Sequence, residues 1–117
     1  MKIVPATDRL VRRYYGTRIP VGMRGYCLVD DSGEPVGVVG FLRKSKDVMV
    51  IFSEGKPEVY EDRKSIIRVA RMMMETADNH GWKLIADRDE DIPSADRFLR
   101  HIGFIVDEEG EYIRWPR

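Results

Sequence analysis

A run of acidic residues is the densest group of potential metal ligands in the chain. Its carboxylates are Asp87, Asp89, Glu90 and Asp91, with Arg88 among them. A metal ion would need these oxygens to converge, and their spacing differs from that of an EF-hand loop. A solvated loop that also caps the following helix is therefore the favoured interpretation, and a metal site is the alternative.

Cys27 is the only cysteine of the chain, so an internal disulfide framework is excluded. It lies in the apolar run Tyr26–Val29, where a thiol is packed like a small hydrophobic side chain. A buried strand residue is favoured over a nucleophile.

Glu54 follows the continuous apolar run Val48–Phe52. Such a run has no polar side to turn to water, so it predicts a strand at the centre of a sheet. A carboxylate at the end of that strand could accept a proton directly or through water, as a general base does. The alternative is a glutamate on a surface loop.

A short helix is predicted after Thr7, whose hydroxyl can cap it, and Gly16 should end it. Its apolar side chains recur at helical spacing: Leu10, Val11, Tyr14 and Tyr15. Its basic side chains are Arg9, Arg12 and Arg13. A solvated basic face is favoured, and a site for an anion or a partner is the alternative.

Two further helices are predicted, a long one over about Asp62–Asn79 and a short one over about Ser94–Ile102. Asp62 can cap the long helix. The run Met72–Met74 is typical of core filling, with a soft contact surface for a ligand as the alternative.

The remaining patterns predict strands, a loop over Thr17–Gly25 and a polar connection over Ser53–Asp62. The predicted strands are Lys2–Ala6, Tyr26–Asp30, Pro35–Leu42, Val48–Phe52, Lys83–Ala86, Phe104–Asp107 and Tyr112–Trp115. The order β-α-β-β-β-α-β-α-β-β predicts an α/β fold, with a mixed sheet and helices on both of its faces.

The bulk composition is that of one globular domain spanning residues 1–117, with 20 basic and 20 acidic side chains. This balance offers no overall basic field, so we expect no nucleic-acid partner. The segment Met1–Pro5 is too short and too soon polar for a signal peptide, and no run approaches the roughly 20 apolar residues of a membrane span. A cytoplasmic protein without a membrane partner is expected.

The order of elements, together with three short motifs, resembles the GNAT family of N-acetyltransferases. The motifs are Ala77-x-x-x-Gly81, the strand Lys83–Ala86, and Ala95 followed eight and nine residues later by Gly103-Phe104. The segment Gly33–Gly37 is similar to the family's second hairpin. The resemblance implies an α/β (α+β) fold, in which a mixed, mostly antiparallel central sheet is flanked by helices on both faces.

The resemblance also implies acetyl-CoA as the acyl donor, held in a wedge where two strands splay apart. Phe52 and Ser53 would line this wedge, and a backbone N–H near Phe52–Glu54 would polarise the thioester carbonyl. Glu54 would deprotonate the amine acceptor. Side chains at the start of the long helix would hold the diphosphate: Arg63, Lys64 and Ser65.

Several positions depart from the family's pattern. The segment Glu61–Ile66 lacks the two glycines of the family's phosphate loop, and Leu99 replaces the tyrosine that protonates the leaving thiolate. Ile92 replaces an asparagine. The alternatives for the acid are Tyr112, Tyr60 and His101. These departures predict a degenerate acyl-CoA site with weak or no N-acetyltransferase activity; the alternative is an active enzyme that acylates an unknown amine.

The segment 91–104 resembles, more narrowly, small GNAT-like proteins of tailed bacteriophages. This resemblance implies a phage-type protein with a phage or host protein as partner, in the cytoplasm of an infected cell or in a virion. The candidate partner surfaces are the basic helix and the loop Pro20–Gly25. The strand Tyr112–Trp115 could also pair with a second copy.

Overall fold

The structure is a computed structural model that describes residues 1–18, 23–86 and 95–117. The acidic run Asp87–Asp91, Ile92 and the first half of the loop Pro20–Gly25 lie outside the described residues. Within the described ranges, no helix is long and apolar enough to cross a membrane.

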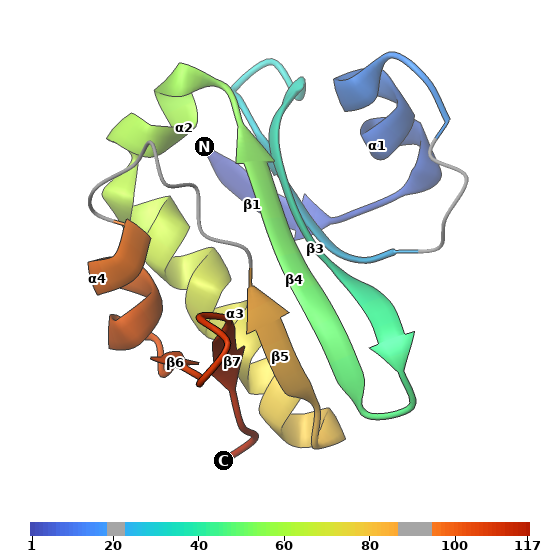
Figure 1. Cartoon of the computed structure of the whole chain (residues 1–117). Coiled ribbons are helices and arrows are strands. Elements are labelled where there is room, and N and C mark those ends of the chain that lie inside the picture. The colour runs from blue at the N-terminus through green and yellow to red at the C-terminus, as the bar shows by residue number, and fades with distance from the viewer. Residues whose placement is uncertain (19–22, 87–94) are drawn as a thin grey trace.

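In the described residues, a seven-stranded sheet carries four helices (Figure 1). The strands are β1 (Lys2–Pro5), β2 (Arg24–Val29), β3 (Pro35–Ser45), β4 (Val48–Gly55), β5 (Lys83–Ala86), β6 (Ile105–Val106) and β7 (Tyr112–Arg114). The helices are α1 (Asp8–Tyr15), α2 (Pro57–Glu61), α3 (Arg63–His80) and α4 (Ala95–His101). The spatial order is β1-β2-β3-β4-β5-β7-β6, and among these described strands only β4 and β5 pair in parallel. The predicted mixed, mostly antiparallel sheet is confirmed.

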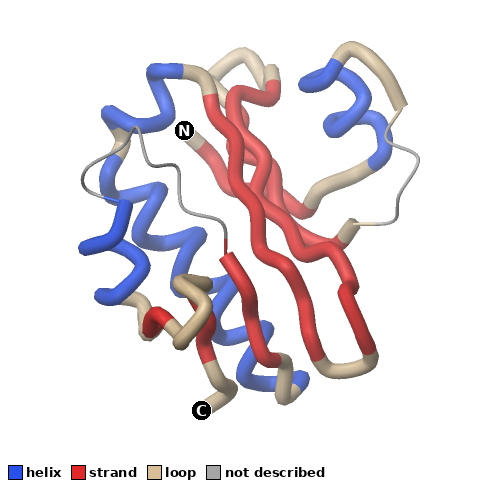
Figure 2. The backbone as a smooth tube through the Cα atoms, in the orientation of Figure 1, coloured by secondary structure: helices blue, strands red, loops and turns tan. Residues whose placement is uncertain are grey.

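The helices cover both faces of the sheet, as Figure 2 shows with α1 on one side and α3 on the other. Val38 packs with Val11 of α1, whereas its neighbour Val39 packs with Met73 of α3. Successive strand residues point to opposite faces, so these two contacts place α1 and α3 on opposite sides.

The long helix α3 buries the predicted apolar stripe. Met73 is fully buried and Met74 nearly so, which confirms core filling for these two residues, whereas Met72 is half-buried. Asp62 caps the helix, and Gly81 ends it with a left-handed backbone (φ 71°).

The predicted polar connection over Ser53–Asp62 is wrong in part. Strand β4 continues to Gly55, and α2 begins at Pro57, a residue suited to the first turn of a helix. The polar pair Ser53-Glu54 has no apolar alternation to mark it, and it is extended because β3 pairs with it from Gly37 to Gly40.

The terminal strand β7 lies between β5 and β6. Both of its edges are therefore paired, and β6 rather than β7 forms that end of the sheet. A second copy could not pair with Tyr112–Arg114 as predicted unless β6 moved.

Candidate functional site

Among the described residues, the second half of β4 has no paired strand on its β5 side, and this side of Phe52–Gly55 is called the opening below. Strand β5 pairs with β4 only from Val48 to Ile51, because β5 ends at Ala86. Beyond Ile51, β4 runs on to Gly55 with β3 as its paired neighbour (Figure 1). Within the described ranges, the parallel pairing thus stops in the middle of the sheet.

The hydrogen-bonding pattern shows which backbone groups face this opening. Lys56 N–H donates to the Val36 carbonyl at 2.8 Å. This bond shows which alternate residues of β4 form hydrogen bonds with β3. In an antiparallel ladder alternate residues turn toward the same partner, so Glu54 and Phe52 bond to β3. Ser53 and Gly55 therefore turn their backbone N–H and C=O groups toward the opening.

Glu54 lies on the face of the sheet that α1 covers. It stands opposite Val38, which packs in the same cluster as Tyr15 and Phe52. The pKa of Tyr15 is raised well above its ordinary value, first by burial and then by the nearby charge of Glu54. Tyr15 thus stays protonated beside the Glu54 carboxylate.

Tyr14 adds a second ring beside this carboxylate. It meets Tyr15 edge to face with 4.9 Å between ring centroids. The pKa of Tyr14 is raised by burial, and further by the charges of Glu54 and Tyr60. The sequence pattern identifies both tyrosines only as apolar positions of a helix, so it does not predict that they lie beside Glu54. The one available signal is that two adjacent aromatic rings each carry a hydroxyl group.

The start of α3 is closed by the chain's own carboxylate. Asp62 Oδ1 accepts the Ser65 N–H at 3.1 Å, and Oδ2 accepts the Ser65 hydroxyl at 2.8 Å. These bonds lower the pKa of Asp62. The predicted cap is confirmed, and it occupies the serine that was assigned to phosphate; Arg63 and Lys64 are exposed beside it.

The turn between β4 and α2 is filled by Val59, which is 6% exposed. A Cβ placed on Gly55 would lie 3.2 Å from Val59 Cβ, and one placed on Gly37 would lie 3.3 Å from Val59 Cγ2. The space beside both glycines is therefore filled by a side chain of the protein itself.

The candidate acids are spread over three elements. The Tyr112 hydroxyl of β7 donates to Asp96 of α4, Tyr60 is a half-exposed residue of α2, and His101 lies exposed at the end of α4. Leu99 is packed against the α3-side core, so the family's acid position is apolar here.

A cavity of about 470 Å³ lies between α3, α4 and Arg117, with Met74 and Phe98 among its lining. It is a separate hollow from the opening on β4. Cys27 is fully buried, and burial raises the pKa of its thiol, as expected of a packed strand residue. Among the described side chains, no group of three or more His, Cys, Asp or Glu residues could hold a metal.

No family model and no curated protein matches this sequence. Solved structures do match the fold. An acetyltransferase of the GNAT family from Staphylococcus aureus Mu50 superposes with a TM-score of 0.72 at 11% identity, over 99% of each chain. The GNAT family N-acetyltransferase YhbS of Escherichia coli, in complex with CoA, gives a TM-score of 0.65 at 12% identity, over 97% of this chain and 80% of that one.

YhhK of Escherichia coli, bound to coenzyme A, gives a TM-score of 0.62 at 12% identity, over 97% of both chains. At these identities the likeness defines the fold alone. The chain has the GNAT fold, and among its described residues the parallel pairing of β4 with β5 stops at Ile51.

Proposed function

We propose that this protein is an N-acyltransferase of low activity that moves an acyl group from a thioester to an amine. The observation that carries the proposal is the opening along β4, where Ser53 turns its backbone N–H outward and Glu54 lies one residue further along. A carbonyl-polarising donor and a carboxylate base are the two groups that such a transfer needs.

In the proposed reaction the amine nitrogen attacks the thioester carbonyl carbon. A carbon–nitrogen bond forms, the carbon–sulfur bond breaks, and the amine proton passes to Glu54. The Ser53 N–H stabilises the charge that develops on the carbonyl oxygen. Tyr15 stays protonated beside the Glu54 carboxylate.

The low activity follows from the lack of an acid at the position where family members protonate the leaving thiolate. Leu99 stands where family members place a tyrosine, so the thiolate has no phenol at that position to protonate it. Positioning and carbonyl polarisation still lower the barrier. The reaction is therefore slowed rather than abolished.

The first test is thermal unfolding with acetyl-CoA. A ligand that binds only the folded state raises the midpoint by mass action, so millimolar acetyl-CoA should raise it. Acyl transfer to a panel of small amines is then followed by release of free thiol. No shift of the midpoint with any thioester at millimolar concentration would overturn the proposal.

A phage-type protein without catalytic activity is the second candidate, acting in the cytoplasm of an infected cell or in a virion. The surface proposed for its protein partner is the basic face of α1, where Arg9, Arg12 and Arg13 border a hollow of about 390 Å³. A photo-crosslinker at position 12 should then trap a protein in the producing cell. The same crosslinker at exposed Lys44 of β3 is the control, and equal trapping at both positions would contradict this candidate.

A further inference from the structure

We propose that this protein holds its thioester donor by the pantetheine arm alone, and that the adenosine diphosphate half of coenzyme A adds nothing to its affinity. The inference rests on the proposed function, because it concerns the donor of that reaction. It names a donor class, any acyl-pantetheine thioester, rather than coenzyme A itself.

The first argument is the closed start of α3. The Ser65 N–H and hydroxyl both donate to Asp62, at 3.1 and 2.8 Å. A diphosphate could use these donors only by displacing a carboxylate that already satisfies them. The diphosphate would also have to approach the negative charge of the Asp62 carboxylate, which the dipole of α3 stabilises at this position.

The second argument is the filled turn after β4. Glycines let a backbone approach a phosphate closely, and Gly55 would be the nearest such residue. Its open side is occupied by Val59, whose Cβ, Cγ1 and Cγ2 lie 3.2, 3.3 and 3.4 Å from where a Cβ of residue 55 would be. The space beside the glycine therefore belongs to the core and not to a ligand.

The third argument is local charge. From Lys56 to Lys64 the chain carries three cationic side chains, at 56, 63 and 64, and three anionic ones, at 58, 61 and 62. The segment has no net positive charge to attract a diphosphate. Arg63 and Lys64 are exposed, so water and salt screen any contact they make.

Pantetheine itself suits the opening. It is an uncharged, extended chain with two amide groups. Among the described residues, β4 has no strand paired on its β5 side beyond Ile51. Ser53 and Gly55 turn N–H and C=O groups to that edge. Such an edge accepts a strand-like ligand by backbone hydrogen bonds, as in β-strand addition.

The test is a titration of ¹⁵N-labelled protein with three probes: coenzyme A, pantetheine and adenosine 3′,5′-bisphosphate. Coenzyme A and pantetheine should move the Ser53 and Gly55 amide signals, with dissociation constants within about 3-fold of each other. The bisphosphate should leave the Ser65 amide unmoved. Coenzyme A binding more than about 10-fold tighter than pantetheine, or a Ser65 shift with the bisphosphate, would overturn the inference.

The variant Asp62→Ala frees the Ser65 donors. Coenzyme A should then bind about 10-fold tighter than pantetheine, because an anion can occupy the helix start. Asp62→Asn retains an acceptor for the cap but removes the charge, so it stays folded and should give a smaller gain. Thr7→Ala removes the matching cap of α1, where Thr7 Oγ1 accepts the Leu10 N–H at 3.2 Å, and should leave the ratio unchanged. An unchanged ratio in both Asp62 variants would contradict the argument.

The outcomes separate the two proposals. If neither pantetheine nor coenzyme A moves Ser53, the proposed function itself is wrong. If both bind but coenzyme A is much the tighter, only the present inference is wrong. Transfer from acetyl-CoA is then compared with transfer from an acetylated acyl carrier protein, which bears pantetheine without adenosine, to identify the donor's source.

Discussion

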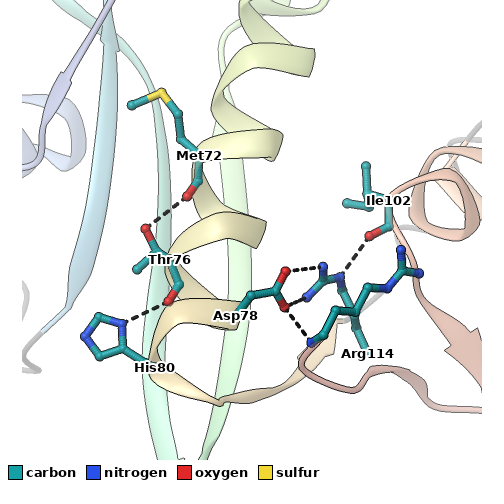
Figure 3. A network of polar contacts seen from close by, with 7 residues as sticks. Met72, Thr76, Asp78, His80, Ile102 and Arg114 are labelled. Carbon is teal, nitrogen blue, oxygen red and sulfur yellow. Dashed lines mark hydrogen bonds and ion pairs between the residues drawn. The ribbon is translucent and has the colours of Figure 1, made fainter.

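Arg114 and Asp78 form a two-pronged ion pair that joins β7 to the end of α3. Arg114 Nη1 lies 2.8 Å from Asp78 Oδ1, and Nη2 lies 3.0 Å from Oδ2 (Figure 3). The guanidinium Nε donates to the Ile102 carbonyl at 3.0 Å, at the end of α4. Arg114 is only 4% exposed, so this one side chain ties three elements together below the surface.

Removing the acid of this pair should destabilise the protein strongly. Asp78→Ala leaves a buried guanidinium without its counter-charge, which costs about 3 kcal/mol of unfolding free energy. Urea denaturation measures the loss. Glu34→Ala is the matched control, because it breaks an exposed pair with Arg13 and should cost less than about 1 kcal/mol. Equal losses in the two variants would contradict the proposed importance of burial.

The contribution of Asp78 should depend on pH. The hydrogen bonds from Arg114 lower the pKa of Asp78 in the folded state. A lowered folded pKa means a contribution that is fully present above the unfolded value of about 3.9 and is lost as pH falls through the folded pKa. The stability difference between wild type and Asp78→Ala should thus be constant near neutral pH and shrink below about pH 4. Urea curves at several pH values test this, and a difference that grows in acid would have the wrong sign.

Two strand glycines should respond differently to a methyl group. A Cβ on Gly25 would lie 2.0 Å from the Val39 carbonyl oxygen, so the backbone of β3 must move. A Cβ on Gly40 would meet Met23 Cε at 2.7 Å and the Phe52 ring at 2.9 Å, which are side-chain ends that can shift. We expect Gly25→Ala to cost about 3 kcal/mol and Gly40→Ala about 1 kcal/mol, by thermal or urea unfolding. The reverse ranking would count against the strand register.

The pair Glu54 and Tyr15 should matter for transfer and little for folding. Glu54→Gln should lower kcat/KM by about 100-fold, as loss of a general base does. Tyr15→Phe removes the hydroxyl beside the carboxylate and should lower it by about 5-fold. Tyr14→Phe is the control, since Glu54 acts on Tyr14 through its charge. Unfolding midpoints are measured on the same samples, and a rate loss that merely followed stability would contradict the assigned role.

His80 should be neutral with its proton on Nδ1 when its two contacts are formed. Nδ1 lies 2.9 Å from the Thr76 carbonyl, which can only accept, and Nε2 lies 3.3 Å from Arg24 Nη1, which can only donate (Figure 3 shows the first contact). The ring stacks on Trp82 at 4.3 Å. Ring ¹⁵N shifts near neutral pH report the tautomer directly, and an Nε2–H form would show that the Arg24 contact is absent in solution.

Local signals in the sequence were enough to predict much of the scaffold. The caps Thr7 and Asp62, the helix end at Gly81 and the strand Lys83–Ala86 all lie where predicted. Each depends on residues within a few positions of one another, so composition and spacing carry the information. The proposed phosphate contacts of Arg63 and Lys64, and the thioester contact of Phe52, remain predictions.

The sequence by itself therefore determined the order of the elements, the stripes that they bury and the departures at Leu99 and at the start of α3. Only the tertiary structure decided that β4 runs past the end of β5, that Tyr15 lies near the charge of Glu54, and that Arg114 meets Asp78. These contacts join residues 36 or more positions apart, which the sheet brings together. No periodicity records them, because strand pairing across such distances depends on the whole fold and not on neighbouring residues.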